Sequence, residues 1–109
     1  MTFHPTNNPV FWKTTAEQLL DAGRFEKAAE AFRQLTELMP NDPDAWRGRA
    51  RSLQSLEHYG DAVAAFERTL ILVPDDIISL NGLAACYEAL GNREKMAACM
   101  LRLDDLGGN

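Results

Sequence analysis

The sequence predicts an all-α fold in which three helical hairpins stack on one another as an array. Three observations predict it: similar residues recur every 34 positions, apolar and small residues follow helical spacing inside each unit, and Pro or Gly interrupts the pattern at matching places. A fixed period of roughly 20 to 50 residues is typical of arrays in which each unit leaves an apolar face that only the next unit covers. The aligned columns are Trp12, Trp46 and Leu80; Ala28, Ala62 and Met96; Phe32, Phe66 and Met100; and Pro40 and Pro74.

The first helix of each unit is expected to begin near residue 9, 43 or 77. An Asx side chain stands at each place, where its oxygen can accept hydrogen bonds from the unpaired amides of a helix start. A proline at the first helical position loses no hydrogen bond. The pairs are Asn8-Pro9, Asp42-Pro43 and Asp75-Asp76, and helical spacing follows, as in Trp46, Ala50, Leu53 and Leu56.

A turn inside each unit is expected at Gly23, at Glu57-His58 and at Gly91-Asn92, so the second helices begin near Phe25, Tyr59 and Arg93. The first two of these helices end before Pro40 and Pro74, because the residue preceding a proline is pushed out of helical geometry. A left-handed residue other than Gly costs about 1 kcal/mol. We therefore expect the middle turn to differ locally from the other two.

Small and aromatic residues at matching positions predict how the six helices pack. Alanines allow close approach, and rings fill the spaces that the alanines leave. The alanines are Ala16, Ala50, Ala84, Ala28 and Ala62, and the rings are Phe25, Phe32, Tyr59, Phe66 and Tyr87. We predict a leader over residues 1–8, one domain over residues 9–107 with repeats at 9–42, 43–76 and 77–107, and a tail over residues 108–109.

These columns resemble the tetratricopeptide repeat, whose signature runs from a Trp through Leu-Gly, Tyr and Ala to an aromatic residue and a closing Pro. The middle unit supplies Trp46, Ala50, Leu53, Ala62, Phe66 and Pro74, and the first supplies Trp12, Ala16, Leu19, Ala28, Phe32 and Pro40. The third keeps Leu83, Ala84, Tyr87 and Gly91 but departs from the signature at Met96, Met100 and Gly108. The resemblance extends from about Pro9 to Gly107.

The resemblance implies a right-handed superhelix in which the first helix of every unit lines a concave, peptide-binding groove. It implies binding, scaffolding or chaperoning rather than catalysis. One subset of the family grips chaperone tails through a set of Lys, Asn and Arg side chains. Lys13 matches the first of these positions, but Glu17, Gly48, Ile78 and Gly82 occupy the others, so we do not predict chaperone-tail binding.

The groove is the predicted binding site for a protein or peptide ligand. Its candidate residues are Lys13, Glu17, Arg47, Arg51, Gln54, Asn81 and Glu88. Arg47 and Arg51 lie one helical turn apart, and a guanidinium suits bidentate contact with a carboxylate, which favours an acidic or C-terminal-carboxylate peptide. In the alternative, these arginines are solvated and pair with Asp44, Glu17 or Glu88.

Arg49 occupies a column in which the family usually has a buried Leu. It points about 200° away from Arg47 around the helix, so Arg47, Arg49 and Arg51 do not form a single basic patch for nucleic acid. We expect Arg49 to reach solvent or to find an acidic partner.

The last helix, near residues 93–106, contains six consecutive apolar residues, which is typical of a helix with neighbours on both sides. We hypothesise a homodimer through this helix, and the candidate interface residues are Met96, Cys99, Met100, Leu103 and Leu106. A docked partner helix and a longer parent chain are the alternatives. A small dimeric secretion-system chaperone or a self-assembling structural module is the rival function.

Composition limits the remaining classes of function. A net charge of −5 disfavours nucleic acid and anionic lipid, and no apolar run reaches the roughly 18 to 20 residues needed to cross a bilayer. Residues 1–9 carry no Lys or Arg, unlike a secretory signal, so we expect a cytoplasmic protein with its two cysteines reduced.

No catalytic or cofactor-binding pattern is present in the sequence. His4 and His58 lack a neighbouring nucleophile, and Cys86 and Cys99 lack a local His for a metal site. No glycine-rich loop follows a strand pattern. We therefore predict a protein that is not an enzyme and that binds no cofactor or metal.

Overall fold

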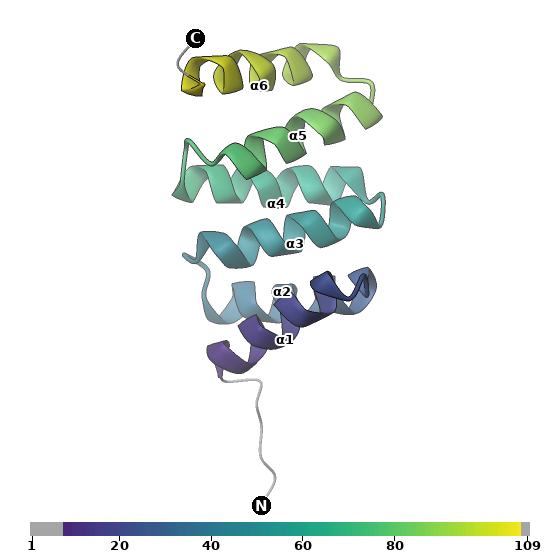
Figure 1. Cartoon of the computed structure of the whole chain (residues 1–109), viewed down its shortest axis with the longest axis vertical. Helices are drawn as coiled ribbons and strands as arrows, with labels where there is room; N and C mark the ends of the chain where they lie inside the picture. Colours follow the sequence, from purple (N-terminus) through teal and green to yellow (C-terminus); the bar gives the residue numbers. More distant parts are fainter. Residues whose placement is uncertain (1–7, 108–109) are drawn as a thin grey trace, which may run out of the picture.

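The computed structural model describes residues 8–107, in which six α-helices follow one another along a single axis and no strand is present (Figure 1). The described residues extend over 56 × 25 × 20 Å, so the molecule is elongated. The helices are α1 (Pro9–Asp21), α2 (Phe25–Leu38), α3 (Pro43–Ser55), α4 (Tyr59–Leu72), α5 (Ile77–Ala89) and α6 (Arg93–Leu106). The predicted all-α solenoid is confirmed, and each helix begins where the sequence pattern placed it. Apart from Asn8, the predicted leader and tail, His4 included, lie outside the described residues.

The first helix of every unit begins with the predicted Asx cap. Asn8 accepts a hydrogen bond from the amide of Val10 at 3.0 Å, and Asp42 accepts one from the amide of Asp44 at 3.0 Å. In the third unit, Asp76 rather than Asp75 provides the cap. Each cap satisfies one of the amides that a helix start leaves unpaired.

The three turns inside the units share one backbone geometry. Gly23, Glu57 and Gly91 have φ angles of 75°, 63° and 77°. In each turn, the next amide donates to a carbonyl five residues back, and the distances from Arg24, His58 and Asn92 are 2.9, 2.9 and 2.8 Å. The expectation of a locally different middle turn was therefore wrong, because the hairpin geometry imposes the left-handed conformation on Glu57 as well.

Replacing Glu57 with glycine is expected to stabilise the protein by about 0.5 to 1 kcal/mol, because glycine removes the steric cost of a positive φ. The gain is limited by the greater freedom of glycine in the unfolded chain. Chemical denaturation would measure the difference. Gly23→Ala is the matched control and should destabilise, and a Glu57→Gly protein with unchanged or lower stability would contradict the explanation.

Phe32 and Phe66 join neighbouring units by filling spaces that two glycines leave open. A Cβ atom on Gly48 of α3 would lie 2.2 Å from the Phe32 ring of α2. A Cβ atom on Gly82 of α5 would likewise lie 2.2 Å from the Phe66 ring of α4. Both rings are buried, so the aligned phenylalanine and glycine columns explain why the units stack at this distance.

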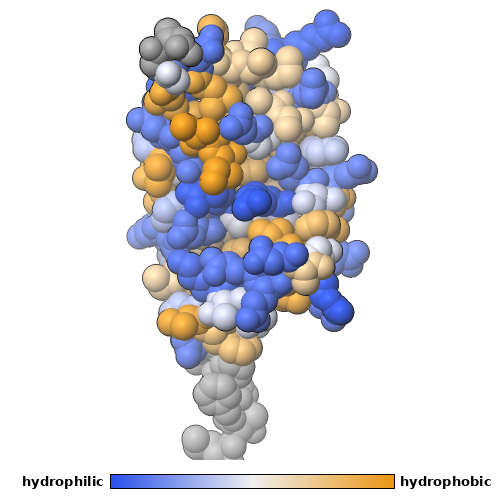
Figure 2. Space-filling view, viewed as in Figure 1, coloured by the Kyte–Doolittle hydropathy of each residue, from blue (hydrophilic) through white to orange (hydrophobic). Residues whose placement is uncertain are grey.

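Among the described residues, no helix covers the outer side of α6. Met100 occupies the column of Phe32 and Phe66 but is 55% exposed, and its neighbour Leu101 is 67% exposed. On the side of the molecule that faces the viewer, Figure 2 shows apolar residues gathered toward the end that carries α5 and α6, whereas hydrophilic residues dominate over α1 and α3. None of the described helices is long and apolar enough to cross a membrane.

Candidate functional site

The first helices of the three units, α1, α3 and α5, line two adjoining hollows on one side of the molecule. The larger hollow has a volume of about 550 Å³ and includes Leu20, Gln54 and Ala85 in its walls. The smaller has a volume of about 360 Å³ and includes Glu17 and Arg47. Arg51 contributes to the walls of both hollows. Four of the predicted groove residues, Glu17, Arg47, Arg51 and Gln54, therefore lie around one continuous depression.

The other predicted groove residues lie apart from these hollows. Asn81 and Glu88 are exposed on α5 but line neither hollow, and Lys13 is engaged with two aspartates instead. The first two units therefore contribute most of the walls of the candidate site.

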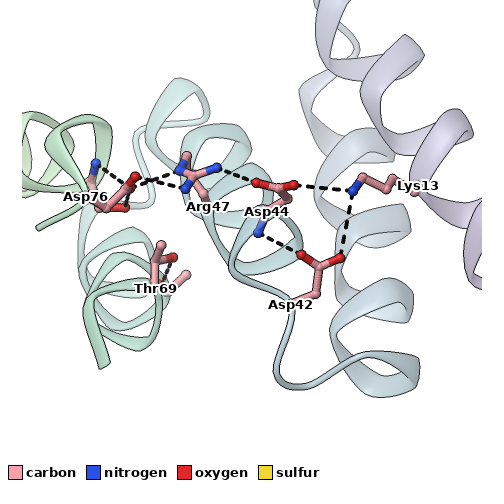
Figure 3. Close-up of polar contacts among 8 residues, drawn as sticks. Lys13, Asp42, Asp44, Arg47, Thr69 and Asp76 are labelled. Atoms are coloured by element: carbon pink, nitrogen blue, oxygen red, sulfur yellow. Dashed lines mark hydrogen bonds and ion pairs between the residues drawn. The ribbon is translucent and has the colours of Figure 1, made fainter. Parts of the chain in front are cut away.

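A chain of ion pairs, here called the charge ladder, connects Lys13, Asp42, Asp44, Arg47 and Asp76 across the three units (Figure 3). Lys13 Nζ lies 3.3 Å from Asp44 and 4.0 Å from Asp42. Arg47 Nη1 lies 2.7 Å from Asp44 Oδ1. Its Nε and Nη2 each donate to Asp76 at 2.9 Å, which is a bidentate contact. The 34-residue repeat maps the Lys13 to Asp42 pair onto the Arg47 to Asp76 pair.

Hydrogen bonding within the charge ladder stabilises the ionised forms of Lys13, Asp44, Arg47 and Asp76. The hydrogen bond from Arg47 lowers the pKa of Asp44, and the hydrogen bond to Asp44 raises the pKa of Lys13. Burial acts to raise the pKa of Asp76, but the hydrogen bonds from Arg47 and Ser79 outweigh it, so this pKa is lowered. These side chains therefore remain charged and paired at neutral pH.

The charge ladder already engages two of the three cations among the candidate groove residues Lys13, Arg47 and Arg51. Lys13 and Arg47 are already bound within the protein, because each closes the junction between its own unit and the next. Within residues 8–107, Arg51 makes no ion pair and no side-chain hydrogen bond. Of the three predicted cations, Arg51 is the one that a ligand carboxylate reaches without breaking an existing pair.

Sequence reasoning missed Asp76 as the main partner of Arg47. It named Asp44, which does pair with Arg47, together with Glu17 and Glu88, which do not pair with any described arginine. The sequence spacing could have indicated this pair. Arg47 and Asp76 are separated by 29 residues, as are their counterparts Lys13 and Asp42. An aspartate that caps a helix and recurs with the repeat is available to the cation of the preceding unit.

Arg49 was expected to reach solvent or to pair with an acidic residue, but it is half-buried and contacts a hydroxyl group and an aromatic ring. Its guanidinium donates to the hydroxyl of Thr36 at 3.2 Å, and its Cζ lies 5.5 Å from the centre of the Trp46 ring. A cation over an indole face is attracted by the ring quadrupole. No described carboxylate forms an ion pair with it.

The five residues predicted at the C-terminal interface do not share one surface. Cys99 is buried in the core with Phe66 and Tyr87, and Met96 packs against the same cluster. The inclusion of Cys99 was therefore wrong, because its helix face points toward α5. Met100 is exposed, whereas Leu103 and Leu106 are half-buried.

The described residues hold few groups suited to chemistry. Cys86 and Cys99 are free and buried, and burial raises the pKa of both thiols, which keeps them neutral and poorly nucleophilic. Within residues 8–107, no three His, Cys, Asp or Glu side chains are arranged as ligands of one metal ion.

The chain is similar to known proteins both in sequence profile and in fold. Residues 19–78, more than half of the chain, match the sequence profile of the tetratricopeptide repeat. No curated protein sequence matches the chain.

Three solved structures illustrate the similarity of the fold. MamA has a TM-score of 0.86 and 17% sequence identity over 92% of this chain and 58% of its own. PcrH, solved in complex with the chaperone binding region of PopD, has a TM-score of 0.85 and 18% identity over 89% of this chain and 73% of its own. The CopN-Scc3 complex contains a chain with a TM-score of 0.81 and 20% identity, over 84% of this chain and 54% of its own. At these identities, the structures share the fold with this chain, which spans roughly half to three quarters of their length.

Proposed function

Because the chain belongs to the tetratricopeptide repeat family, we propose that it is a non-enzymatic interaction module that holds a peptide segment of a partner protein in the depression between α1 and α3. The observation that carries this proposal is the position of Arg51. Its side chain is exposed, lines both hollows and is unpaired among the described residues, while Lys13 and Arg47 are bound within the charge ladder.

The shape and chemistry of the depression fit a peptide. Volumes of about 550 and 360 Å³ lie in the range of sites that enclose small ligands or side chains. Arg51 and Gln54 supply donors, and Leu20 and Tyr59 supply apolar contact. Acidic Glu17 and Asp21 on the opposite wall would repel a long run of carboxylates. We therefore propose a ligand with a single carboxylate, from an acidic side chain or a free C-terminus, placed at Arg51, with an apolar group of the ligand against Leu20 and Tyr59.

Arg51→Glu is expected to weaken binding of such a peptide by about tenfold or more, because it replaces a charge-assisted hydrogen bond with repulsion. The binding of short synthetic peptides, with free or amidated C-termini and with acidic or neutral side chains, would be measured by fluorescence anisotropy. Arg93→Glu is the matched control, since it changes the same charge at an exposed residue that lines neither hollow. Equal affinity of parent and Arg51→Glu for every selected peptide would contradict the proposal.

A second candidate function, self-association, is favoured by the outer side of α6. Met100 holds the place that Phe32 and Phe66 hold elsewhere, but nothing covers it within the described chain. The outer face of α1 offers no matching space, because Thr14 stands in the column of Gly48 and Gly82. Head-to-tail stacking of copies is therefore disfavoured, and we propose a closed dimer in which two α6 helices meet around a two-fold axis.

The parent protein is expected to sediment as a dimer of its 12.2 kDa chain at tens of micromolar. The double change Met100→Glu and Leu101→Glu should produce a monomer, because it places charges on the apolar face that would be buried. Val10→Glu, at a side chain that is 71% exposed on α1, is the control and should leave the mass unchanged. A monomeric parent protein at these concentrations would exclude the dimer.

A further inference from the structure

A third hollow lies on the outer side of the molecule, between the second helices α4 and α6. Its volume is about 610 Å³. Leu70 and Ile71 of α4 form one wall, and Leu80 and Leu83 of α5 form the floor. Ile71 is 69% exposed, although it borders this apolar space. Unlike the groove hollows, this one involves α6 and includes neither Arg51 nor Arg47.

The corresponding place one repeat earlier, between α2 and α4, is occupied by the chain's own tryptophan. Trp46 donates its indole N–H to the carbonyl oxygen of Pro40 at 2.8 Å. The guanidinium carbons of Arg49 and Arg68 each lie 5.5 Å from the centre of the Trp46 ring. The space that remains beside these residues has a volume of about 390 Å³. An aromatic ring, a carbonyl acceptor and two cations thus define this position.

In the third unit, the ring is lost, whereas the prolyl carbonyl and one of the two arginines are kept. The 34-residue repeat places Leu80 at the position of Trp46, and Leu83 at that of Arg49, so the floor is wholly apolar. Arg102 stands at the position of Arg68 and lines the hollow. Among the described residues, the carbonyl oxygen of Pro74, the counterpart of Pro40, accepts no hydrogen bond.

Charge around the hollow also suits a flat aromatic guest. Arg102 pairs at the surface with Asp75 at 2.6 Å, so its guanidinium is held near the opening. Lys95 Nζ lies 5.7 Å from the centre of the Tyr87 ring, and the Tyr87 hydroxyl donates to Glu67 at 3.1 Å. The polar groups therefore stand at the edge, while the aliphatic side chains of α4 and α5 form the interior.

From this internal comparison, we propose that the outer hollow is a second protein-binding site, which receives the indole ring of a tryptophan from a partner protein. The ring lies over Leu80, in the part of the space that the larger Trp46 fills in the preceding interval and Leu80 leaves open, with its face toward Arg102 and its N–H toward the Pro74 carbonyl. Tryptophan is favoured over phenylalanine because the indole N–H can donate to this carbonyl, as Trp46 donates to Pro40, whereas a phenyl ring has no donor. This site is independent of the proposed peptide groove, since the two share no residue.

Free indole is the probe for the chemistry of the hollow. In methyl NMR spectra, indole is expected to shift the signals of Leu70, Ile71, Leu80 and Leu83 saturably, with a dissociation constant on the order of 1 mM, and to leave Leu19 and Leu20 in the first unit unchanged. Absence of saturable shifts at these four residues would overturn the proposal. Shifts of equal size at Leu19 and Leu20 of α1 would also overturn it, because indole would then bind without preference for the outer hollow.

Leu80→Trp is the decisive variant, because it restores within the chain the side chain that the proposal assigns to the partner. Its melting temperature is expected to rise, and its affinity for indole to fall about tenfold or more. Ile71→Glu provides a second variant at an exposed position, where folding does not depend on the side chain, and it should also weaken indole binding. Val10→Glu is its matched control and should bind indole as the parent does. Unchanged affinity in both Leu80→Trp and Ile71→Glu would refute the site.

Selection from displayed peptides separates this site from the groove. Peptides selected by the parent protein at the outer hollow should contain Trp, compete with indole, and bind Arg51→Glu normally but Leu80→Trp weakly. Peptides that bind Leu80→Trp normally but Arg51→Glu weakly are ligands of the groove. If all Trp-containing peptides bind Leu80→Trp normally and Arg51→Glu weakly, they are ligands of the groove. The proposed site at the outer hollow is then wrong, and the proposed function stands.

Discussion

Gly82→Ala is expected to destabilise the protein by about 2 to 3 kcal/mol, which corresponds to a loss of roughly 10 to 20 °C in melting temperature for a domain of this size. Alanine is the better helix former by about 1 kcal/mol, so propensity alone predicts the opposite sign. Steric overlap decides the outcome, because the added Cβ would lie 2.2 to 2.7 Å from three carbons of the Phe66 ring. That ring is fully buried, so it can move only if α4 and α5 separate.

Two further variants test whether the loss comes from this contact. Gly60→Ala, in the first turn of α4, meets no atom within 4 Å and should be neutral or slightly stabilising. Phe66→Leu is destabilising by itself, but in its background Gly82→Ala should cost much less, and a double-mutant cycle in urea would measure this coupling. Additive effects of the two changes would show that the glycine and the ring do not interact. The same cycle with Gly48→Ala and Phe32→Leu tests the equivalent contact at the preceding junction between units.

Asp76→Ala is the second change with a large expected effect, also about 2 to 3 kcal/mol. The substitution removes the bidentate contact with Arg47 and the cap on the Ser79 amide together. The side chains of Arg47 and Asp76 are only 18% and 12% exposed, so water compensates for the lost charge partner only partly. The expected cost combines about 1 kcal/mol for the cap with about 1 to 2 kcal/mol for the charged hydrogen bonds. Equilibrium unfolding in urea would measure it.

Asp76→Asn separates the cap from the charge, because asparagine caps a helix about as well as aspartate, as Asn8 does in the first unit. It should recover about half of the loss at neutral pH. The pKa of Asp76 is lowered in the folded protein, so the stabilisation is complete above the usual aspartate pKa of about 4 and is lost as the pH falls through the lowered value. The difference between the parent and Asp76→Asn should therefore shrink as the pH falls below the usual aspartate pKa, and a difference that does not change with pH would contradict an ionic origin.

The helix boundaries could be predicted from the sequence because local rules decide them. Asx caps, prolines and the 34-residue period act over a few residues, and they placed all six helix starts correctly. The middle turn was an exception, because the pairing of α3 with α4 imposes the left-handed conformation on Glu57, whatever that residue prefers alone. Tertiary geometry prevailed over a local cost of about 1 kcal/mol.

The candidate site could be predicted less completely than the fold. Residue type and helical face identified Glu17, Arg47, Arg51 and Gln54 as lining a depression. They did not show that Arg47 was already bound, because its partner Asp76 belongs to the cap of the next unit rather than to a groove helix. The burial of Cys99 was missed for a related reason: six consecutive apolar residues surround the helix, so periodicity cannot show which side faces inward.

The charge ladder stops at Asn81, which stands where Lys13 and Arg47 stand in the preceding units. The first and second units are each joined to the next by both a buried ring and an ionic contact, so among the described units the first and the third have one such interface each and the second has two. In a linear assembly whose free energy is a sum over neighbours, a member with a single interface opens more often than one with two. A partner that docks on α6 therefore binds a fluctuating surface. Its apparent affinity is lowered by the free energy that is needed to order this surface.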